Sequence, residues 1–283
     1  MALAFRLGDQ RHDLRDRTLV MGILNRTPDS FYDRGATFAL DTLLRRAEHL
    51  VLEGADVLDV GGVKAGPGPD VSEAEELDRT IPTVEALRDR VPVPLSVDTW
   101  RAAVLDAACA AGAVVGNDIS GFADPDYLRV AVRHGASVVA THIRLAPRVP
   151  DPEPVYLDLV GDVRAFLAGR ADAARRVGLD ADQIALDAGL DLGKTPAMSA
   201  VLLRETNLLA RLGYPVLLSA SNKRFLGDLL GLAIDERREA SLAAVAYGVA
   251  RGARIVRVHD VAGTVRVCRT LEGILGATAV PVP

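Results

Sequence analysis

The stretch Met21-Gly-Ile-Leu-Asn-Arg-Thr-Pro-Asp-Ser-Phe31 decides how the rest of the chain is interpreted. Its first half has the apolar character of a buried strand, which stops at Asn25, where a Thr-Pro-Asp loop begins. Polar side chains just beyond the carboxyl end of a buried strand are where α/β proteins keep their chemistry. The segment therefore predicts the first strand of an α/β fold, with Asn25 at its functional edge.

Short apolar runs alternate with longer amphipathic segments along most of the 283 residues. Strands are predicted at Leu19–Leu24, Val57–Val60, Leu95–Val97, Val114–Gly116, Val138–Ala140, Ile184–Leu186, Val216–Leu218 and Ile255–Val258. Helices are predicted between the strands, for example at Asp41–Glu53, Ala74–Arg90, Arg101–Ala111, Tyr156–Val177, Met198–Leu212, Arg237–Arg251 and Thr264–Ile274. About eight strand–helix units favour a single-domain TIM (β/α)8 barrel over residues 1–283 rather than an open doubly wound sheet. No Gly-x-Gly-x-x-Gly follows the first strand, which lowers the dinucleotide-binding alternative.

Composition narrows the class of protein. Apolar residues make up 49% and aromatic residues 4%, so Ala, Val and Leu do the packing. The net charge of -5 argues against a nucleic-acid surface, and no apolar run reaches the length of a membrane span. The first residues lack the pattern of a signal peptide, and Cys109 and Cys268 form neither a disulfide framework nor a metal-ligand spacing. We expect a soluble, cytoplasmic protein.

Polar residues end nearly every predicted strand. Because the carboxyl ends of barrel strands converge on one face, one rim is expected to hold them together. The expected set is Asn25, Asp59, Asp98, Asn117, Asp187, Lys223, Arg257 and His259. A single strand-end aspartate is more often a helix N-cap or turn residue, and Asp59, Asp118 and Asp260 fit that explanation. Capping does not account for the whole set, because Ser or Thr would serve it equally well.

This mixture of side chains suits a planar nitrogen heterocycle that carries an anionic leaving group. Carboxylates and amides accept hydrogen bonds from ring N–H groups, and Lys223, Arg257 and His259 supply positive charge for a phosphate-like group. The start of the last helix would add backbone N–H groups for the same anion. The stretch 144–154 contains four prolines, so we expect an irregular loop, either on the surface or as a lid over the site.

At these residues the chain resembles the dihydropteroate synthases, from Leu19 to about Leu275. The shared elements are Asn25-x-Thr-Pro-Asp-Ser-Phe31, Asp59-Val-Gly-Gly62, Ser96-Val-Asp-Thr99, Asn117-Asp118, Asp187-x-Gly189, Gly193-Lys-Thr195, Ser221-x-Lys223 and Arg257-Val-His-Asp260. The family joins p-aminobenzoate to a dihydropterin by displacing diphosphate, and it uses a TIM barrel. The resemblance implies a pterin pocket made by Asp98, Asn117, Asp187 and Lys223, of which Asp98 and Lys223 are the catalytic candidates. It also implies diphosphate binding by Arg257, His259 and Asn25, the last with Mg²⁺, and a homodimer.

The departures from the family pattern cluster around the second substrate. The loop Thr and Arg of the family are Ala65 and Gly66 here, and the hydroxyl that receives the aminobenzoate carboxylate is replaced by Arg224. The family's Gly-Phe pair is Asp191-Leu192, and its Met-His-Met is Thr141-His-Ile143. This combination looks like the second, non-folate paralogue of actinobacteria. Arg26 and Lys64 offer an alternative, because they could restore the lost positive charge.

Four functions therefore stay open. The first is a pterin-binding paralogue with weak or absent p-aminobenzoate condensation, and the second is an active dihydropteroate synthase with unusual loops. The third is a pterin-binding module that delivers a methyl group, as in corrinoid methyltransferases, which Lys223 and His259 argue against. The fourth is a catalytically silent scaffold barrel.

Overall fold

A closed barrel of eight parallel strands forms the centre of the molecule, in the order β10-β3-β4-β5-β6-β7-β8-β9. This computed structural model describes residues 3–26, 36–66 and 68–276. The strands are β3 (Leu19–Asn25), β4 (Val57–Gly61), β5 (Leu95–Asp98), β6 (Val115–Asp118), β7 (Ser137–Thr141), β8 (Ile184–Asp187), β9 (Val216–Leu218) and β10 (Ala253–Val258). The parallel pairing of β10 with β3, which aligns Ile255 with Leu19, closes the barrel. The predicted TIM barrel is thus confirmed.

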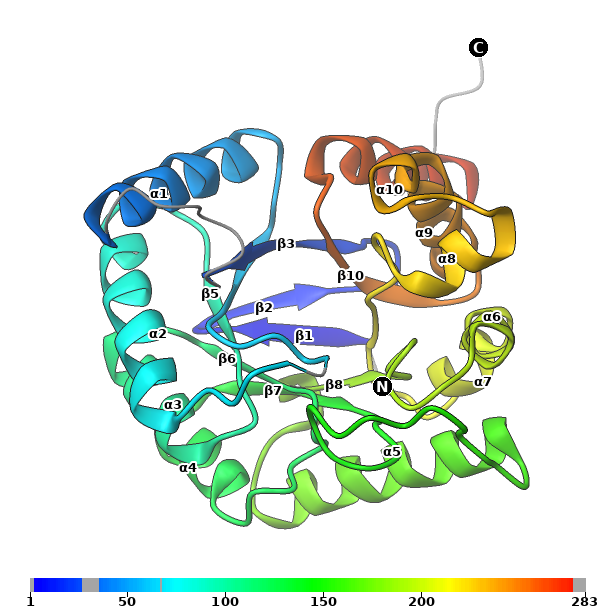
Figure 1. Cartoon of the computed structure of the whole chain (residues 1–283), viewed down its shortest axis with the longest axis horizontal. Coiled ribbons are helices and arrows are strands. Elements are labelled where there is room, and N and C mark those ends of the chain that lie inside the picture. Colours follow the sequence, from blue (N-terminus) through cyan, green and yellow to red (C-terminus); the bar gives the residue numbers. More distant parts are fainter. Residues whose placement is uncertain (1–2, 27–35, 67, 277–283) are drawn as a thin grey trace.

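Helices cover the outside of this barrel, as Figure 1 shows. They are α1 (Ala36–Leu52), α2 (Glu73–Arg88), α3 (Ala102–Ala111), α4 (Tyr127–His134), α5 (Leu159–Arg176), α6 (Pro196–Arg204), α7 (Thr206–Ala210), α8 (Arg224–Leu230), α9 (Arg238–Ala250) and α10 (Val261–Ile274). Short-range contacts determine where α6 begins. Thr195 caps α6 by accepting the amide of Met198 at 3.2 Å, and Pro196 occupies the first turn, where no amide donor is needed.

Three features depart from the sequence-based expectation. Helices α4 and α8 are additional, and the predicted helix Met198–Leu212 is divided at Glu205 into α6 and α7. At the division, the Thr206 hydroxyl donates to the carbonyl oxygen of Leu203 at 2.7 Å, a local bond of the kind by which threonine competes with regular helix. The third feature is an N-terminal hairpin, made of β1 (Ala4–Leu7) and β2 (Gln10–Asp13).

The hairpin plugs the amino end of the barrel. Phe5, Leu7 and Leu14 are almost fully buried, and they pack against the lowest inward-facing side chains of the strands, such as Met21 and Val139. In Figure 1, β1 and β2 cross the centre of the ring of strands. Because this end is filled with apolar side chains, the polar residues at the opposite, carboxyl end form the open mouth. Among the described residues, no helix combines the length and apolar character needed to cross a bilayer.

Candidate active site

An ion-pair network from three strands lies at the barrel mouth. The guanidinium of Arg257, from β10, donates through Nε to Asp59 on β4 at 2.6 Å and through a terminal nitrogen to Asp98 on β5 at 2.7 Å. Asp59 is fully buried and also accepts from Ser96 Oγ at 2.5 Å and Asn117 Nδ2 at 3.1 Å. Asp59 is therefore the centre of a network, and the interpretation of this residue as a cap is wrong.

Asp98 is poised to change its charge near neutral pH. Burial raises its pKa to about 7, Arg257 opposes this rise, and the nearby carboxylates of Asp59 and Glu76 add to it. The shift follows from the cost of removing a carboxylate from water where negative charge is already present. Asp98 can thus donate or accept a hydrogen bond at physiological pH.

Asp187 and Lys223 meet on the other side of the mouth. Asp187 ends β8, is buried, and accepts the amide of Gly189 at 2.8 Å. Its burial raises its pKa, whereas burial of Lys223 lowers the pKa of that ammonium group. Lys223 Nζ donates to the carbonyl oxygen of Leu190 at 2.7 Å, in the loop that follows Asp187. The structure therefore brings together Asp98, Asn117, Asp187, Lys223 and Arg257.

His259 lies at the outer rim and differs from the expectation of a positive charge. Its Nδ1 is 3.0 Å from Ser221 Oγ, and its carbonyl oxygen accepts from Arg46 of α1 at 3.0 Å. Desolvation, followed by the cations Arg257, Arg46 and Lys223, lowers the pKa of His259 to about 4, although the residue reaches the surface. The imidazole is therefore neutral at pH 7, and the positive charge beside it comes from the arginines.

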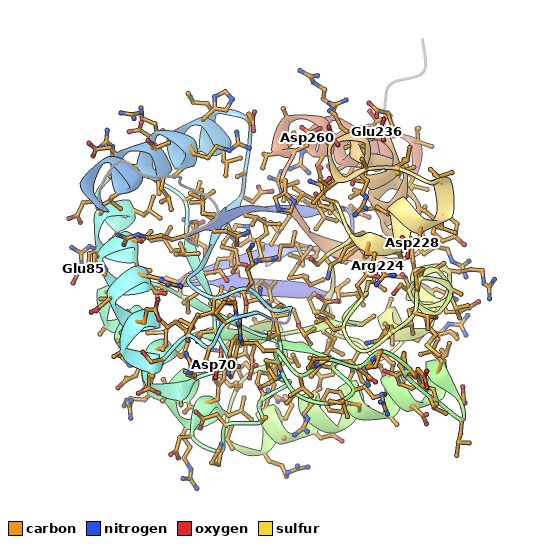
Figure 2. The ribbon with its side chains drawn as sticks, viewed as in Figure 1. Asp70, Glu85, Arg224, Asp228, Glu236 and Asp260 are labelled. Carbon is orange, nitrogen blue, oxygen red and sulfur yellow. The ribbon has the colours of Figure 1, made fainter. Side chains whose placement is uncertain are left out.

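The first turn of α10 is already occupied by a carboxylate of the chain. Asp260 accepts the amide of Gly263 at 2.9 Å and pairs with Arg238 at 2.8 Å. Asp260 is seen at this helix end in Figure 2. It is an N-cap, as the simpler interpretation predicts, so this amide is not open to an external anion. Asp118 is likewise a turn residue, because it accepts the amides of Ser120 at 2.6 Å and Phe122 at 2.8 Å.

Asn25 ends β3 and is exposed at the rim. Its Oδ1 faces Gly61 so closely that a Cβ atom at that glycine would lie 3.2 Å from it. Within the described part of the chain, no group of three His, Cys, Asp or Glu side chains could hold a metal ion. Magnesium commonly takes few protein ligands when phosphate oxygens and water complete its shell. Asn25 therefore fits a Mg²⁺ ion only if the ion arrives with a diphosphate. Residues 27–31 of the opening motif lie outside the described residues.

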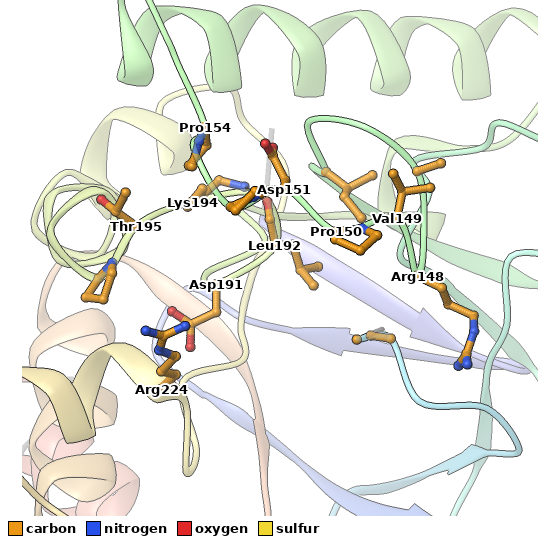
Figure 3. Close-up of a pocket in the computed structure, with 17 residues that line it drawn as sticks. Arg148, Val149, Pro150, Asp151, Pro154, Asp191, Leu192, Lys194, Thr195 and Arg224 are labelled. Atoms are coloured by element: carbon orange, nitrogen blue, oxygen red, sulfur yellow. Dashed lines mark hydrogen bonds between the residues drawn. The ribbon is translucent and has the colours of Figure 1, made fainter. Parts of the chain in front are cut away.

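Beside the network is a pocket of about 350 Å³. Its walls come from the loop after β4, the Pro-rich loop after β7, the loop after β8 and the start of α8, and Figure 3 shows their side chains around the cavity. The three positions that depart most from the family pattern, Ala65, Gly66 and Arg224, all line this one pocket. So do Asp191 and Leu192. The sequence departures therefore alter one continuous cavity.

Arg148 ties the Pro-rich loop to the loop after β4. Its guanidinium donates to the carbonyl oxygen of Lys64 at 2.9 Å and to that of Pro69, and its amide donates to the carbonyl oxygen of Ala65 at 3.2 Å. The stretch 144–154 is thus an irregular loop, as predicted, and it forms part of the pocket wall. Arg144 holds the far end of the loop through a bidentate pair with Asp151, at 2.5 Å for both bonds.

Lys194 and His142 form a buried pair that the sequence analysis does not assign to the site. Lys194 Nζ lies 3.0 Å from His142 Nδ1 and donates to the carbonyl oxygens of Gly189 and Leu192, both at 2.9 Å. Burial lowers the pKa of Lys194 to about 7, and burial together with Lys194 lowers that of His142 to about 3. The pair braces the loop that carries the partners of Asp187 and Lys223. Two elements of the sequence point to this pair, Gly193-Lys-Thr195 and Thr141-His-Ile143.

Arg26 does not restore the charge lost from the pocket. It donates to the carbonyl oxygen of Arg79 at 2.7 Å and to Thr83 Oγ1 at 2.9 Å, both on α2. The side chain is therefore committed to the helix that covers β4. The suggestion that Arg26 replaces the family's loop arginine is not supported by this geometry.

The chain is similar to known pterin-binding proteins along most of its length. The profile of the family described as pterin binding enzyme matches residues 21–259. A Mycobacterium leprae protein named inactive dihydropteroate synthase 2 is 44% identical over 92% of this chain and 92% of its own length. The dihydropteroate synthase of a Synechocystis species is 41% identical over 95% of this chain and 94% of its own length.

The fold of the chain also superimposes on solved structures of dihydropteroate synthases. A Xanthomonas albilineans dihydropteroate synthase with 4-aminobenzoic acid superimposes with a TM-score of 0.90 and 37% identity, covering 99% of this chain and all of the other. The same organism's enzyme in complex with 7,8-dihydropteroate gives a TM-score of 0.86 at 36% identity, over 98% of this chain and all of the other.

Proposed function

Because the chain belongs to the pterin-binding enzyme family and is dihydropteroate synthase-like along nearly its whole length, we propose that it binds a pterin diphosphate or a similar anionic heterocycle, with p-aminobenzoate condensation weak or absent. One observation carries this proposal: Asp98, Asn117, Asp187, Lys223 and Arg257 converge at the mouth, whereas the altered Ala65, Gly66 and Arg224 share the adjacent pocket.

The residues at the mouth fit the two parts of such a ligand. Asp187 and Asn117 would accept ring N–H groups in a water-poor site, where charge-assisted hydrogen bonds are strong. Arg257, with neutral His259 and Ser221 beside it, would face the diphosphate. Asp98, which shares Arg257 with Asp59, would contact the heterocycle and so link both halves of the ligand.

The chemistry that the family performs breaks the C–O bond between the pterin methylene and the diphosphate, which leaves with the electron pair. An amine nitrogen then forms the new C–N bond and loses a proton. Groups that stabilise charge as it develops lower the barrier of such a step most effectively. We propose Arg257 for the departing diphosphate and Asp98 and Lys223 for the heterocycle. A Mg²⁺ ion, if it arrives with the diphosphate, would neutralise part of its charge, with Asn25 as one ligand.

An active dihydropteroate synthase is the alternative. It is favoured by the Synechocystis relative and by the retention of Lys223 and Arg257 at the mouth. A turnover assay with p-aminobenzoate and dihydropterin diphosphate separates the two. We expect a rate from about 10²-fold to well over 10³-fold below a typical enzyme rate of about 1 to 10 per second, because two or three contacts worth about 1.5–3 kcal/mol each are missing. A rate near 1 per second would establish the alternative.

Ligand binding tests the proposal without turnover. We expect dihydropterin diphosphate to raise the melting temperature, since a ligand that binds only the folded state stabilises it. Asp187→Ala should abolish this rise, and pyrophosphate with Mg²⁺ should raise the melting temperature on its own. If neither ligand shifts the melting temperature, the binding site is wrong and the scaffold function takes its place.

We further propose that two copies form a homodimer in the cytoplasm. Large apolar side chains are exposed on and beside neighbouring helices α8, α9 and α10, such as Leu230 at 64%, Tyr247 at 44% and Ile274 at 72%. Both described cysteines are free thiols, which fits a reducing compartment. Light scattering should give twice the chain mass, and Tyr247→Glu should halve it.

A further inference from the structure

We propose that Asp191 sets the ligand class of the pocket beside the barrel mouth: it selects an uncharged or cationic amine with an apolar body and disfavours a carboxylate. This inference rests on the proposed function, because it names the second ligand of that site. The carboxylate of Asp191 lies in the wall of the 350 Å³ pocket, next to Arg224, and Figure 3 shows both side chains.

The structure holds Asp191 in a backbone conformation that most side chains avoid. Its φ is +64°, in the left-handed region, where the related motif has glycine. Two contacts keep it there. Ser199 Oγ accepts the Asp191 amide at 3.0 Å and donates to Oδ1 at 3.1 Å, and the amide of Phe225 donates to Oδ2 at 3.3 Å. A conformation held by its surroundings in this way is typical of a ligand-facing position.

The cations around the pocket are largely committed to the protein. Lys194 directs its ammonium hydrogens at the carbonyl oxygens of Gly189 and Leu192, and Arg148 directs its guanidinium at those of Lys64 and Pro69. Arg224 pairs through Nε with Asp228 at 3.1 Å. A carboxylate ligand would find the donors of Lys194 and Arg148 already directed at carbonyl oxygens. At Arg224 it would compete with Asp228 and would be repelled by the nearby carboxylate of Asp191.

The rest of the lining sets the shape of the ligand. Prolines 150, 152, 154 and 196, with Val149 and Leu192, give an apolar wall. An apolar body would pack against this wall, whereas hydrogen-bond donors at the far end would find the Asp191 carboxylate. A neutral amide or a cation satisfies both conditions, and an anion satisfies only the first.

A series of three ligands with the same shape tests this. The ligands are 4-aminobenzoate, 4-aminobenzamide and 4-aminobenzamidine, with charges of -1, 0 and +1. Calorimetry uses the full-length protein saturated with 6-hydroxymethylpterin and magnesium pyrophosphate. For the unmodified protein we expect the benzamidine to bind on the order of tenfold or more tightly than the benzoate, with the amide between, as one nearby charge at partial exposure predicts.

Asp191→Asn is the decisive variant, because asparagine also tolerates the left-handed conformation. Its amide oxygen can accept from Phe225 N–H while its NH2 group donates to Ser199 Oγ. In this variant the dissociation constants of the three ligands should differ by only about threefold or less. Asp126→Asn, which removes an exposed carboxylate at the start of α4, outside the pocket lining, should leave the order and the differences in affinity unchanged and so controls for net charge. Asp191→Gly, which removes the carboxylate and restores the residue of the related motif, should also reduce the difference in affinity among the three ligands.

The inference is overturned if the benzoate binds best to the unmodified protein, if Asp191→Asn leaves these differences in affinity unchanged, or if none of the three ligands binds while the pterin does. Failure of the pterin itself to bind would instead overturn the proposed function. The two failures are therefore distinguishable in the same titrations.

Discussion

Asp98 gives the sharpest quantitative prediction. Its pKa in the folded protein is raised from an ordinary 3.8 to about 7 by burial, so between these values the folded state holds a proton that the unfolded state releases. A raised pKa contributes stability that is fully present below pH 3.8 and is lost as the pH rises through 7. The loss approaches about 1.4 kcal/mol per pH unit inside this window.

The change to make is Asp98→Asn, which keeps the shape and removes the titration. Between pH 5 and pH 8 the unmodified protein should lose about 2–3 kcal/mol of unfolding free energy from this one carboxyl. The difference between variant and unmodified protein, measured by urea unfolding at each pH, should shift by that amount in favour of the variant. His142 and His259, whose lowered pKa values act in the opposite direction as the pH falls through 6.5, are present in both proteins and cancel to first order.

Asp126→Asn serves as the control, because that carboxylate is exposed. Its difference curve should be flat over the same pH range. Parallel stability curves for Asp98→Asn and the unmodified protein, within about 0.5 kcal/mol, would refute the reasoning, since they would mean that Arg257 keeps Asp98 ionised throughout.

Three further changes test other parts of the structure. Gly189→Ala should destabilise the protein in urea unfolding by more than about 3 kcal/mol, because a Cβ there would lie 1.9 Å from the His142 carbonyl oxygen, whereas Gly213→Ala, also left-handed but with open space, should lose only about 1–2 kcal/mol. Phe5→Ala should lower the unfolding free energy by about 3–5 kcal/mol through the cavity it leaves under the barrel. Arg148→Ala should speed proteolytic cleavage in the loop after β4 with little change in melting temperature, since it removes two hydrogen bonds that tie this loop down; an unchanged cleavage pattern would contradict the role of Arg148.

The sequence predicts the barrel well because its strands are short apolar runs that alternate with longer amphipathic segments. Each expected strand matches an observed one to within about two residues at either end. The hairpin escapes prediction because its strands have four residues each and β2 is largely exposed. Helices α4 and α8 have only eight and seven residues, shorter than the window of about 11 residues or more over which an amphipathic pattern is identified.

The candidate site is predictable in its membership but not in its pairing. Strand-end polarity brings Asp98, Asn117 and Asp187 to one rim. That Arg257 bridges two carboxylates depends on side-chain reach across the barrel, which no local pattern encodes. The same is true of Arg148, whose partners lie 79 and 84 positions away. The capping of α10 by Asp260, in contrast, is a short-range feature and follows from the sequence.

The plug at the bottom of the barrel has a consequence for how the chain is made. Phe5 is synthesised about 210 residues before Leu217 and about 250 residues before Ile255, yet both belong to the wall against which it packs. At about 5–20 residues per second, that interval lasts roughly 10 to 50 s. During that interval the apolar face of the hairpin has no barrel wall to pack against. The nascent chain therefore exposes a hydrophobic segment that chaperones would bind. Slower translation should lengthen the time for which they stay bound.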